Sequence, residues 1–134
     1  MRSICTSIVA TLVLAGTSFA ATINVPGDYA TIQSAIYASS NGDVIAIAAG
    51  TYYEHELNPN GKAITIGSAS GNLDVTIDAD GIGSVFGFAS GEGDGTVIKD
   101  LVITGGHGDY GGGILCDNSD PTISGCTISG NTAY

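Results

Sequence analysis

Three side chains that can bind metals or transfer protons stand in a row at Glu54, His55 and Glu56. We place this segment at the end of an extended strand, where successive side chains point to opposite faces. The two glutamates then face away from the histidine, and the three side chains do not share one ion. The pattern predicts a solvated strand end.

A second group of candidate ligands consists of aspartates in or beside turns: Asp78, Asp80, Asp94, Asp117 and Asp120. A carboxylate in a turn bonds the backbone of its own turn, and it is also an oxygen ligand of the kind that Ca²⁺ takes. The stretch GGHGDYGGG is close to a calcium-binding nonapeptide, but its aspartate stands at the fifth position and not the sixth. We predict no cofactor, leave Ca²⁺ open, and assign no metal ligand.

The first 20 residues have the organisation of a secretory signal peptide. Arg2 precedes an apolar run over residues 8–16, and the small residues Ser18 and Ala20 stand before the expected cut. The run is shorter than the about 20 residues of a transmembrane helix. We predict a signal peptide over 1–20, a mature domain over 21–134, a secreted, extracellular or cell-surface location, and no transmembrane segment.

The chain is strongly acidic, with 13 Asp and Glu against 3 Lys and Arg and a formal net charge of −10. Beyond the leader the basic residues are Lys62 and Lys99. Binding to phosphate requires clustered Lys or Arg, so anionic membranes are poor partners for this chain, and we predict no nucleic-acid partner. A charge of this sign is typical of a soluble secreted surface.

Two of the 3 cysteines, Cys116 and Cys126, lie beyond the leader. Cys116 shares a strand face with Ile114, and Cys126 shares one with Ile128, so we expect both sulfurs to point into the core. Buried thiols and a disulfide both remain open, because an exported protein permits a bridge. The sequence has neither CxxC spacing nor a zinc ligand set.

The elements that position these residues are one helix and many short strands. A strand over 22–25 precedes a helix that we expect over 29–39, with Asp28 as its cap. After the turn at 41–42 the apolar pattern has period two, which is typical of strands. We expect strands over residues 44–48, 51–54, 63–67, 75–78, 85–89, 96–98, 101–104, 114–116, 122–123 and 126–129.

An internal repeat decides how these strands are arranged. Residues 96–106 align with residues 121–131 at a constant offset of 25, which places Leu101 on Cys126 and Ile103 on Ile128. A fixed period of this size is typical of a solenoid, in which each turn buries its apolar side chains by stacking on a neighbour. We expect Leu101 and Cys126 in one inward ladder, about 4.8 Å apart.

The repeat carries a family resemblance. The stretch INVPGDYATIQSAIYASSNGDVIAIAAGTYYE resembles the amino-terminal cap and first coil of right-handed parallel β-helix proteins of the pectin-lyase-like superfamily. The tail resembles secreted bacterial β-helix repeats, and its GGGI at 111–114 is similar to a motif of polymorphic outer membrane proteins. The resemblance implies a right-handed parallel β-helix, with a cap over about 21–42 and coils over about 43–134.

Enzymes of that superfamily include polysaccharide lyases, pectin methylesterases and polygalacturonases. Gly106-His107-Gly108 reproduces one polygalacturonase motif, but the paired aspartates and the NTD and RIK motifs that accompany it are missing. Lyase action on uronates requires a basic side chain, and the chain beyond residue 20 contains no arginine. We assign no catalytic or cofactor-binding residue and place His107 in a loop.

Three functions stay open. We favour a structural or binding scaffold that contacts extracellular polysaccharide or cell-surface matrix. The alternatives are the amino-terminal part of a polysaccharide lyase or glycoside hydrolase, with its catalytic coils beyond residue 134, and an adhesin or autotransporter-type passenger. Because no closing element follows the last strand, we also expect further coils of the same chain, or a second copy, at the carboxyl-terminal end.

Overall fold

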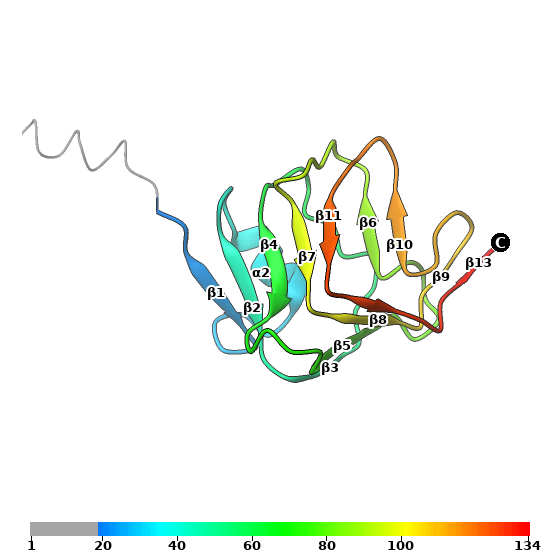
Figure 1. Ribbon diagram of the computed structural model, residues 1–134, viewed down its shortest axis with the longest axis horizontal. Helices are drawn as coiled ribbons and strands as arrows, with labels where there is room; N and C mark the ends of the chain where they lie inside the picture. Colours follow the sequence, from blue (N-terminus) through cyan, green and yellow to red (C-terminus); the bar gives the residue numbers. More distant parts are fainter. Residues whose placement is uncertain (1–18) are drawn as a thin grey trace, which may run out of the picture.

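Short parallel strands wind around a common axis in this protein (Figure 1). The computed structural model describes residues 19–134, so the predicted signal peptide lies almost wholly outside the described residues. The elements in chain order are β1 (Thr22–Val25), α2 (Ile32–Ala38), β2 (Val44–Ile47), β3 (Gly50–Tyr52), β4 (Thr65–Ser68), β5 (Val75–Asp78), β6 (Phe86–Phe88), β7 (Val97–Lys99), β8 (Val102–Thr104), β9 (His107–Gly108), β10 (Ile114–Cys116), β11 (Thr122–Ser124), β12 (Thr127–Ile128) and β13 (Thr132–Ala133).

These strands form four sheets in which every pairing is parallel. The five-stranded sheet has the order β1-β2-β4-β7-β11, and the four-stranded sheet has the order β3-β5-β8-β12. The other two sheets are two-stranded and pair β6 with β10 and β9 with β13. The chain is a parallel β-solenoid of about four turns with one short helix, which confirms the predicted all-β fold.

The 25-residue repeat of the sequence corresponds to the strand register between the last two turns. Ile123 pairs with Ile98, and Ile128 pairs with Ile103. The Thr127 N–H donates to the Leu101 carbonyl at 2.9 Å, so Cys126 follows Leu101 in the same ladder as predicted. Earlier turns have loops of other lengths, which explains why the repeat is visible in the sequence only near its end.

The core consists of side chains that stack along the axis from one turn to the next. Ile45, Ile66 and Ile98 are in register from β2 to β4 to β7, and all three are fully buried. Within β6, the rings of the fully buried Phe86 and Phe88 lie 5.8 Å apart and nearly parallel. The largest other fully buried side chains are Ile32, Ile36, Ile45, Ile47, Leu57, Ile64, Ile66, Ile77, Ile98 and Leu101. Each such side chain stabilises the fold by about 1.5–3 kcal/mol through burial.

Helix α2 covers the first end of the solenoid, and the first full turn holds it at both ends. Glu54 accepts the Ile32 N–H at 2.8 Å, and the Lys62 ammonium donates to the Ile36 carbonyl at 2.7 Å. A carboxylate at the amino end and an ammonium at the carboxyl end both suit the helix dipole. Glu54 and Lys62, which follow the helix in the sequence, therefore bind helix α2 to the solenoid.

The predicted cap at Asp28 is wrong, and the helix begins later than expected. Thr31 is the N-cap, and its hydroxyl accepts the Ser34 N–H at 3.2 Å. Asp28 instead accepts the Asn24 N–H at 2.8 Å and closes the turn after β1. The carboxylate is used locally because the chain turns at residues 26–28 before the helix starts.

The inward side chains of the last described turn are covered by the preceding turn on one side and are uncovered on the other. Ile123 is 36% exposed and Ile128 is 49% exposed, whereas their partners Ile98 and Ile103 are fully buried. Among residues 19–134 no helix is long and apolar enough to cross a membrane.

Candidate binding face

The outward side chains of the five-stranded sheet form two straight rows, because each strand alternates and the register is constant. One row consists of Thr22, Val44, Thr65, Val97 and Thr122. The neighbouring row consists of Asn24, Ala46, Gly67, Lys99 and Ser124. We call these two rows the binding face. It combines hydroxyls with small apolar groups and contains no aromatic side chain.

A shallow groove crosses the binding face where its side chains are smallest. Val44, Ala46, Thr65, Gly67 and Lys99 line it. Gly67 leaves room for the aliphatic stem of Lys99, because a Cβ at residue 67 would stand 2.8 Å from the Lys99 Cγ. The missing side chain therefore both deepens the groove and lets Lys99 lie across it.

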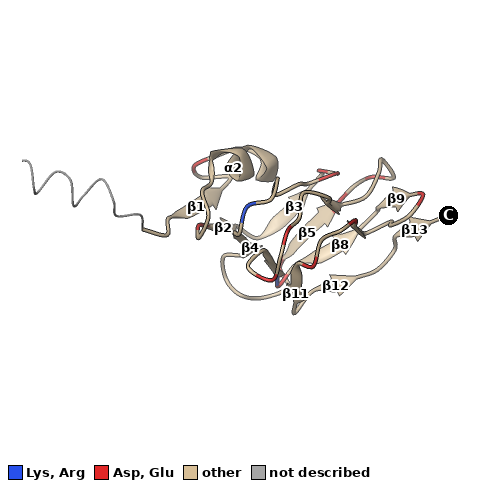
Figure 2. Cartoon of the chain, turned by 90° about the horizontal axis from the view of Figure 1, so that it is seen from above, with Lys and Arg blue, Asp and Glu red and all other residues tan. Residues whose placement is uncertain are grey.

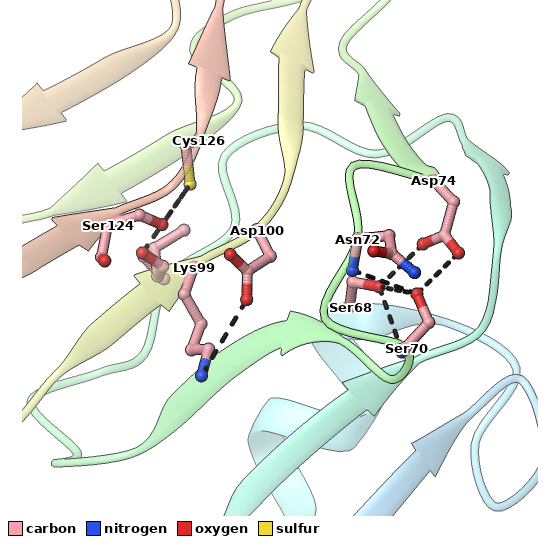
Figure 3. Close-up of polar contacts among 9 residues, drawn as sticks. Ser68, Ser70, Asn72, Asp74, Lys99, Asp100, Ser124 and Cys126 are labelled. Carbon is pink, nitrogen blue, oxygen red and sulfur yellow. Dashed lines mark hydrogen bonds and ion pairs between the residues drawn. The ribbon is translucent and has the colours of Figure 1, made fainter.

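The turn after β4 borders the groove at Ser68. Figure 3 shows Ser68, Ser70 and Asp74 facing one another there: each of the two hydroxyls donates to one Asp74 carboxylate oxygen at 2.7 Å. These two hydrogen bonds, with that from Ser70 the stronger, hold the pKa of Asp74 below its usual value. The border is thus an ionised turn that is held by hydrogen bonds between its own side chains.

Lys99 is the basic residue on this face, since Lys62 is bound to the carbonyls at the end of α2. The Lys99 ammonium lies 3.9 Å from the Asp100 carboxylate, and the Lys99 side chain is 48% exposed. Figure 3 shows this pair. An exposed pair at this distance contributes little to stability and leaves the ammonium available to a ligand.

The outer face of the four-stranded sheet offers a comparable single row: Thr51, Thr76, Val102 and Thr127. Neither the groove on the binding face nor the hollow beside Ala21 includes a residue of this row. It is therefore the natural internal control for the binding face.

The row of Glu54, His55 and Glu56 does not behave as a strand end. The residues follow β3, and Glu56 has a left-handed backbone with a φ of 51°, so the predicted alternation of the side chains is wrong. Glu54 turns to the helix, and the His55 Nδ1 lies 3.5 Å from a Glu56 carboxylate oxygen. The three side chains do not converge on a common point.

His107 lies in a strand and not in a loop, which corrects our expectation. It pairs with Thr132 as part of β9, and its ring packs edge-on against Tyr134 with the centroids 4.9 Å apart. Two-residue strands such as β9 and β13 carry no periodicity of their own. The repeat offset was the signal that could have found them.

Asp78 and Asp80 lie side by side, whereas Asp94, Asp117 and Asp120 belong to other turns, and Figure 2 shows acidic residues mostly on the segments between strands. Asp78 accepts the Asp80 N–H at 2.8 Å, and Asp117 accepts the Asn118 amide at 2.8 Å. Asp94 and Asp120 contribute backbone contacts to their turns. In the described part of the chain, no three His, Cys, Asp or Glu residues are placed to hold a metal ion.

Cys116 and Cys126 are both free thiols, and of the two Cys126 packs against the core. Cys126 is half-buried and contacts the core, whereas Cys116 is exposed. Cys116 pairs with the buried Phe88 on one side, but no strand of the described residues pairs with β10 on its other side. Cys116 therefore shares the inward face of Phe88, as the strand pattern predicts, but its thiol is exposed and not buried.

Glu92 is a buried carboxylate that the sequence did not reveal. It is 2% exposed and accepts the N–H groups of Gly61 and Ser90 and the hydroxyl of Ser119, at 2.8–2.9 Å. Burial alone would raise the pKa of Glu92, but these donors outweigh it and hold the pKa below its usual value. The carboxylate ties three turns together and is a structural group.

Comparison with known proteins finds no matching family model, no matching curated protein and no matching solved structure.

Proposed function

We propose that this protein is a secreted or cell-surface scaffold that binds an extended polysaccharide along the binding face. The observation that supports this is the groove over Ala46, Thr65, Gly67 and Lys99 on a flat parallel sheet. Rows of equivalent positions repeat at each strand spacing of about 4.8 Å, and a polymer also repeats its hydroxyls. Threonine hydroxyls both donate and accept hydrogen bonds, which suits such a ligand.

The kinship with pectin-lyase-like β-helix proteins belongs to the same proposal. Its support is the parallel register of the turns together with the capping helix at the amino-terminal end. Export through the signal peptide over residues 1–20 belongs to it as well, on the sequence pattern of Arg2 and the apolar run.

A partner at the last turn completes the proposal. Ile123 and Ile128 stand exposed beside the free edges of β11 and β12, and an uncovered strand edge pairs readily with another strand. The partner is a further turn of the same fold or a second copy of the chain. Sedimentation of the protein at increasing concentration separates the two, since only the second gives a dimer.

Binding to a panel of neutral and acidic polysaccharides, measured by affinity electrophoresis, tests the function. Thr65→Glu fills the groove with a charged side chain and should weaken retention at least tenfold. Thr76→Glu is the matched control, because Thr76 is equally half-buried and points outward from the other sheet. Lys99→Ala should weaken binding of acidic polymers more than of neutral ones.

Two outcomes contradict the proposal. If no polysaccharide retains the protein, or if Thr65→Glu and Thr76→Glu weaken retention equally, the binding face has no such role. New reducing ends or unsaturated products in the same incubations, with and without calcium, would instead support the alternative of a carbohydrate-active enzyme.

A further inference from the structure

Ala21 lies at the edge of the solenoid, and its backbone carbonyl and nitrogen both make hydrogen bonds there. Its carbonyl accepts the Val44 N–H at 2.8 Å, and its nitrogen donates to the Asp43 Oδ1 at 2.9 Å. The Asp43 Oδ2 accepts the Ser40 N–H at 2.8 Å. Asp43 is only 7% exposed, so a buried carboxylate directs one oxygen at the nitrogen of residue 21.

That nitrogen changes its chemistry if the leader is removed where the sequence predicts. Hydrolysis of the Ala20–Ala21 peptide bond by a host signal peptidase consumes one water. The hydroxyl adds to the Ala20 carbonyl carbon, which leaves as a carboxylate, and the nitrogen of Ala21 becomes a free amine. An α-amine has a pKa of about 7.7–8.0 and is largely protonated at neutral pH, so it then has three donors and a positive charge.

We propose that Asp43 is a docking site for the new α-ammonium of Ala21, so that cleavage after Ala20 converts the hydrogen bond between a neutral amide and the Asp43 carboxylate into a part-buried ion pair. The inference rests on the export that the proposed function includes. The donor then carries a positive charge as well, and hydrogen bonds between a cation and a carboxylate are among the strong ones in proteins. Processing thereby fixes the first strand of the five-stranded sheet against the helix cap.

The surroundings of Ala21 suit a cation. Besides Asp43, the open hollow beside Ala21 is lined by Ile23, Asp28, Tyr29 and Ala38, so a second carboxylate borders the same hollow. The N–H groups of Ala21 and Ser40 hold the pKa of Asp43 below its usual value, so this carboxylate is ionised at neutral pH. The Lys62 ammonium, which donates to the Ile36 and Tyr37 carbonyls, also acts on Asp43, with a smaller effect on the pKa of that carboxyl than the two N–H groups. A cut one residue later would remove the nitrogen that Asp43 binds.

The position of the cut is tested by exporting the full chain from a bacterial host. Amino-terminal sequencing and the intact mass of the exported protein should both give Ala21 as the first residue. Any other first residue overturns the assignment.

The ion pair is tested on the exported protein through the pKa of its α-amine, measured by the pH dependence of amine acylation. We expect a pKa at least one unit above that of a free peptide of residues 21–27, and a return towards the peptide value in Asp43→Asn. Asp28→Asn should give a smaller change, since its carboxylate lines the hollow without bonding the nitrogen. An amine pKa equal to that of the peptide overturns the proposal even if Asp43→Asn does not fold.

Stability gives an independent readout. Because the ion pair raises the amine pKa in the folded state, its contribution is fully present below about pH 8 and is lost as the pH rises through the folded value. The exported protein should therefore lose more stability between about pH 7 and 10 than Asp43→Asn does. Polysaccharide is absent from these measurements, so their failure is distinct from a failure of the binding proposal.

Discussion

The Glu54 carboxylate accepts the N–H of Ile32 at 2.8 Å across 22 positions of the sequence. Its other oxygen accepts the N–H of Gln33 at 3.1 Å, so one side chain satisfies two free donors of the helix. The helix has only 7 residues, too few to be stable alone. The contact thus ties the short helix to the first full turn of the solenoid.

Replacement of Glu54 should therefore destabilise the whole domain. We expect Glu54→Ala to lower the free energy of unfolding by about 1–2 kcal/mol, as for loss of a helix cap. Glu56→Ala is the matched control, since its side chain is 72% exposed and lies beside His55 and Gly83 rather than the helix, and it should change stability much less. Urea denaturation of the two variants measures the difference; equal losses would mean that the cap contact is unimportant.

The inward ladder should be most sensitive where it is covered on both sides. Ile103 is fully buried and pairs with Ile128, which is 49% exposed. We expect Ile103→Ala to cost about 2–5 kcal/mol and Ile128→Ala clearly less, because a cavity forms only where neighbours surround the lost atoms. Chemical denaturation compares them, and the reverse order would contradict the stacking of these turns.

Acid should destabilise the protein in part through Glu92. Its pKa is lower in the folded state than in the unfolded chain, so its contribution is present above about pH 4.5 and is lost as the pH falls through the folded value. Glu92→Gln should be less stable than the native chain at pH 6, and the gap should shrink at pH 3. Unfolding midpoints at the two pH values measure this. A gap that stays constant would show that the carboxylate does not titrate with unfolding.

The two cysteines of the solenoid should be free thiols of unequal reactivity. Burial raises the pKa of both thiols, and Asp120 and Glu92 raise that of Cys116 further. Because Cys116 is exposed and Cys126 is half-buried, a maleimide should label Cys116 first, with a rate that increases with pH. Peptide mapping by mass spectrometry reads the order; a disulfide-linked peptide would contradict it.

The solenoid was predictable because apolar residues recur in the sequence at the positions that the strand register pairs. Ile98 and Ile123 fall at the same place in a 25-residue repeat, and the structure pairs them. Period-two strands and turn residues gave the location of most strands, within a few residues at each end. The burial of a side chain such as Cys116 was less predictable, because it depends on whether a neighbouring turn covers it.

Long-range polar contacts could not be predicted from the sequence. Glu54 and Lys62 look like isolated surface charges, yet they bind the two ends of the helix. Glu92 stands between glycines without any periodic signal, and three separate turns supply its donors. The groove at Gly67 likewise depends on Lys99, a residue of the following turn. Such contacts require the register of the coils and not only their pattern.

Scalar couplings across backbone hydrogen bonds, measured by NMR on the isotope-labelled chain, report the strand register directly. Three donor–acceptor pairs should couple: Val97 nitrogen with the Ile64 carbonyl carbon, Thr122 with Thr96, and Thr127 with Leu101. Couplings between these residues and antiparallel neighbours, or a register other than this one, would contradict a parallel solenoid.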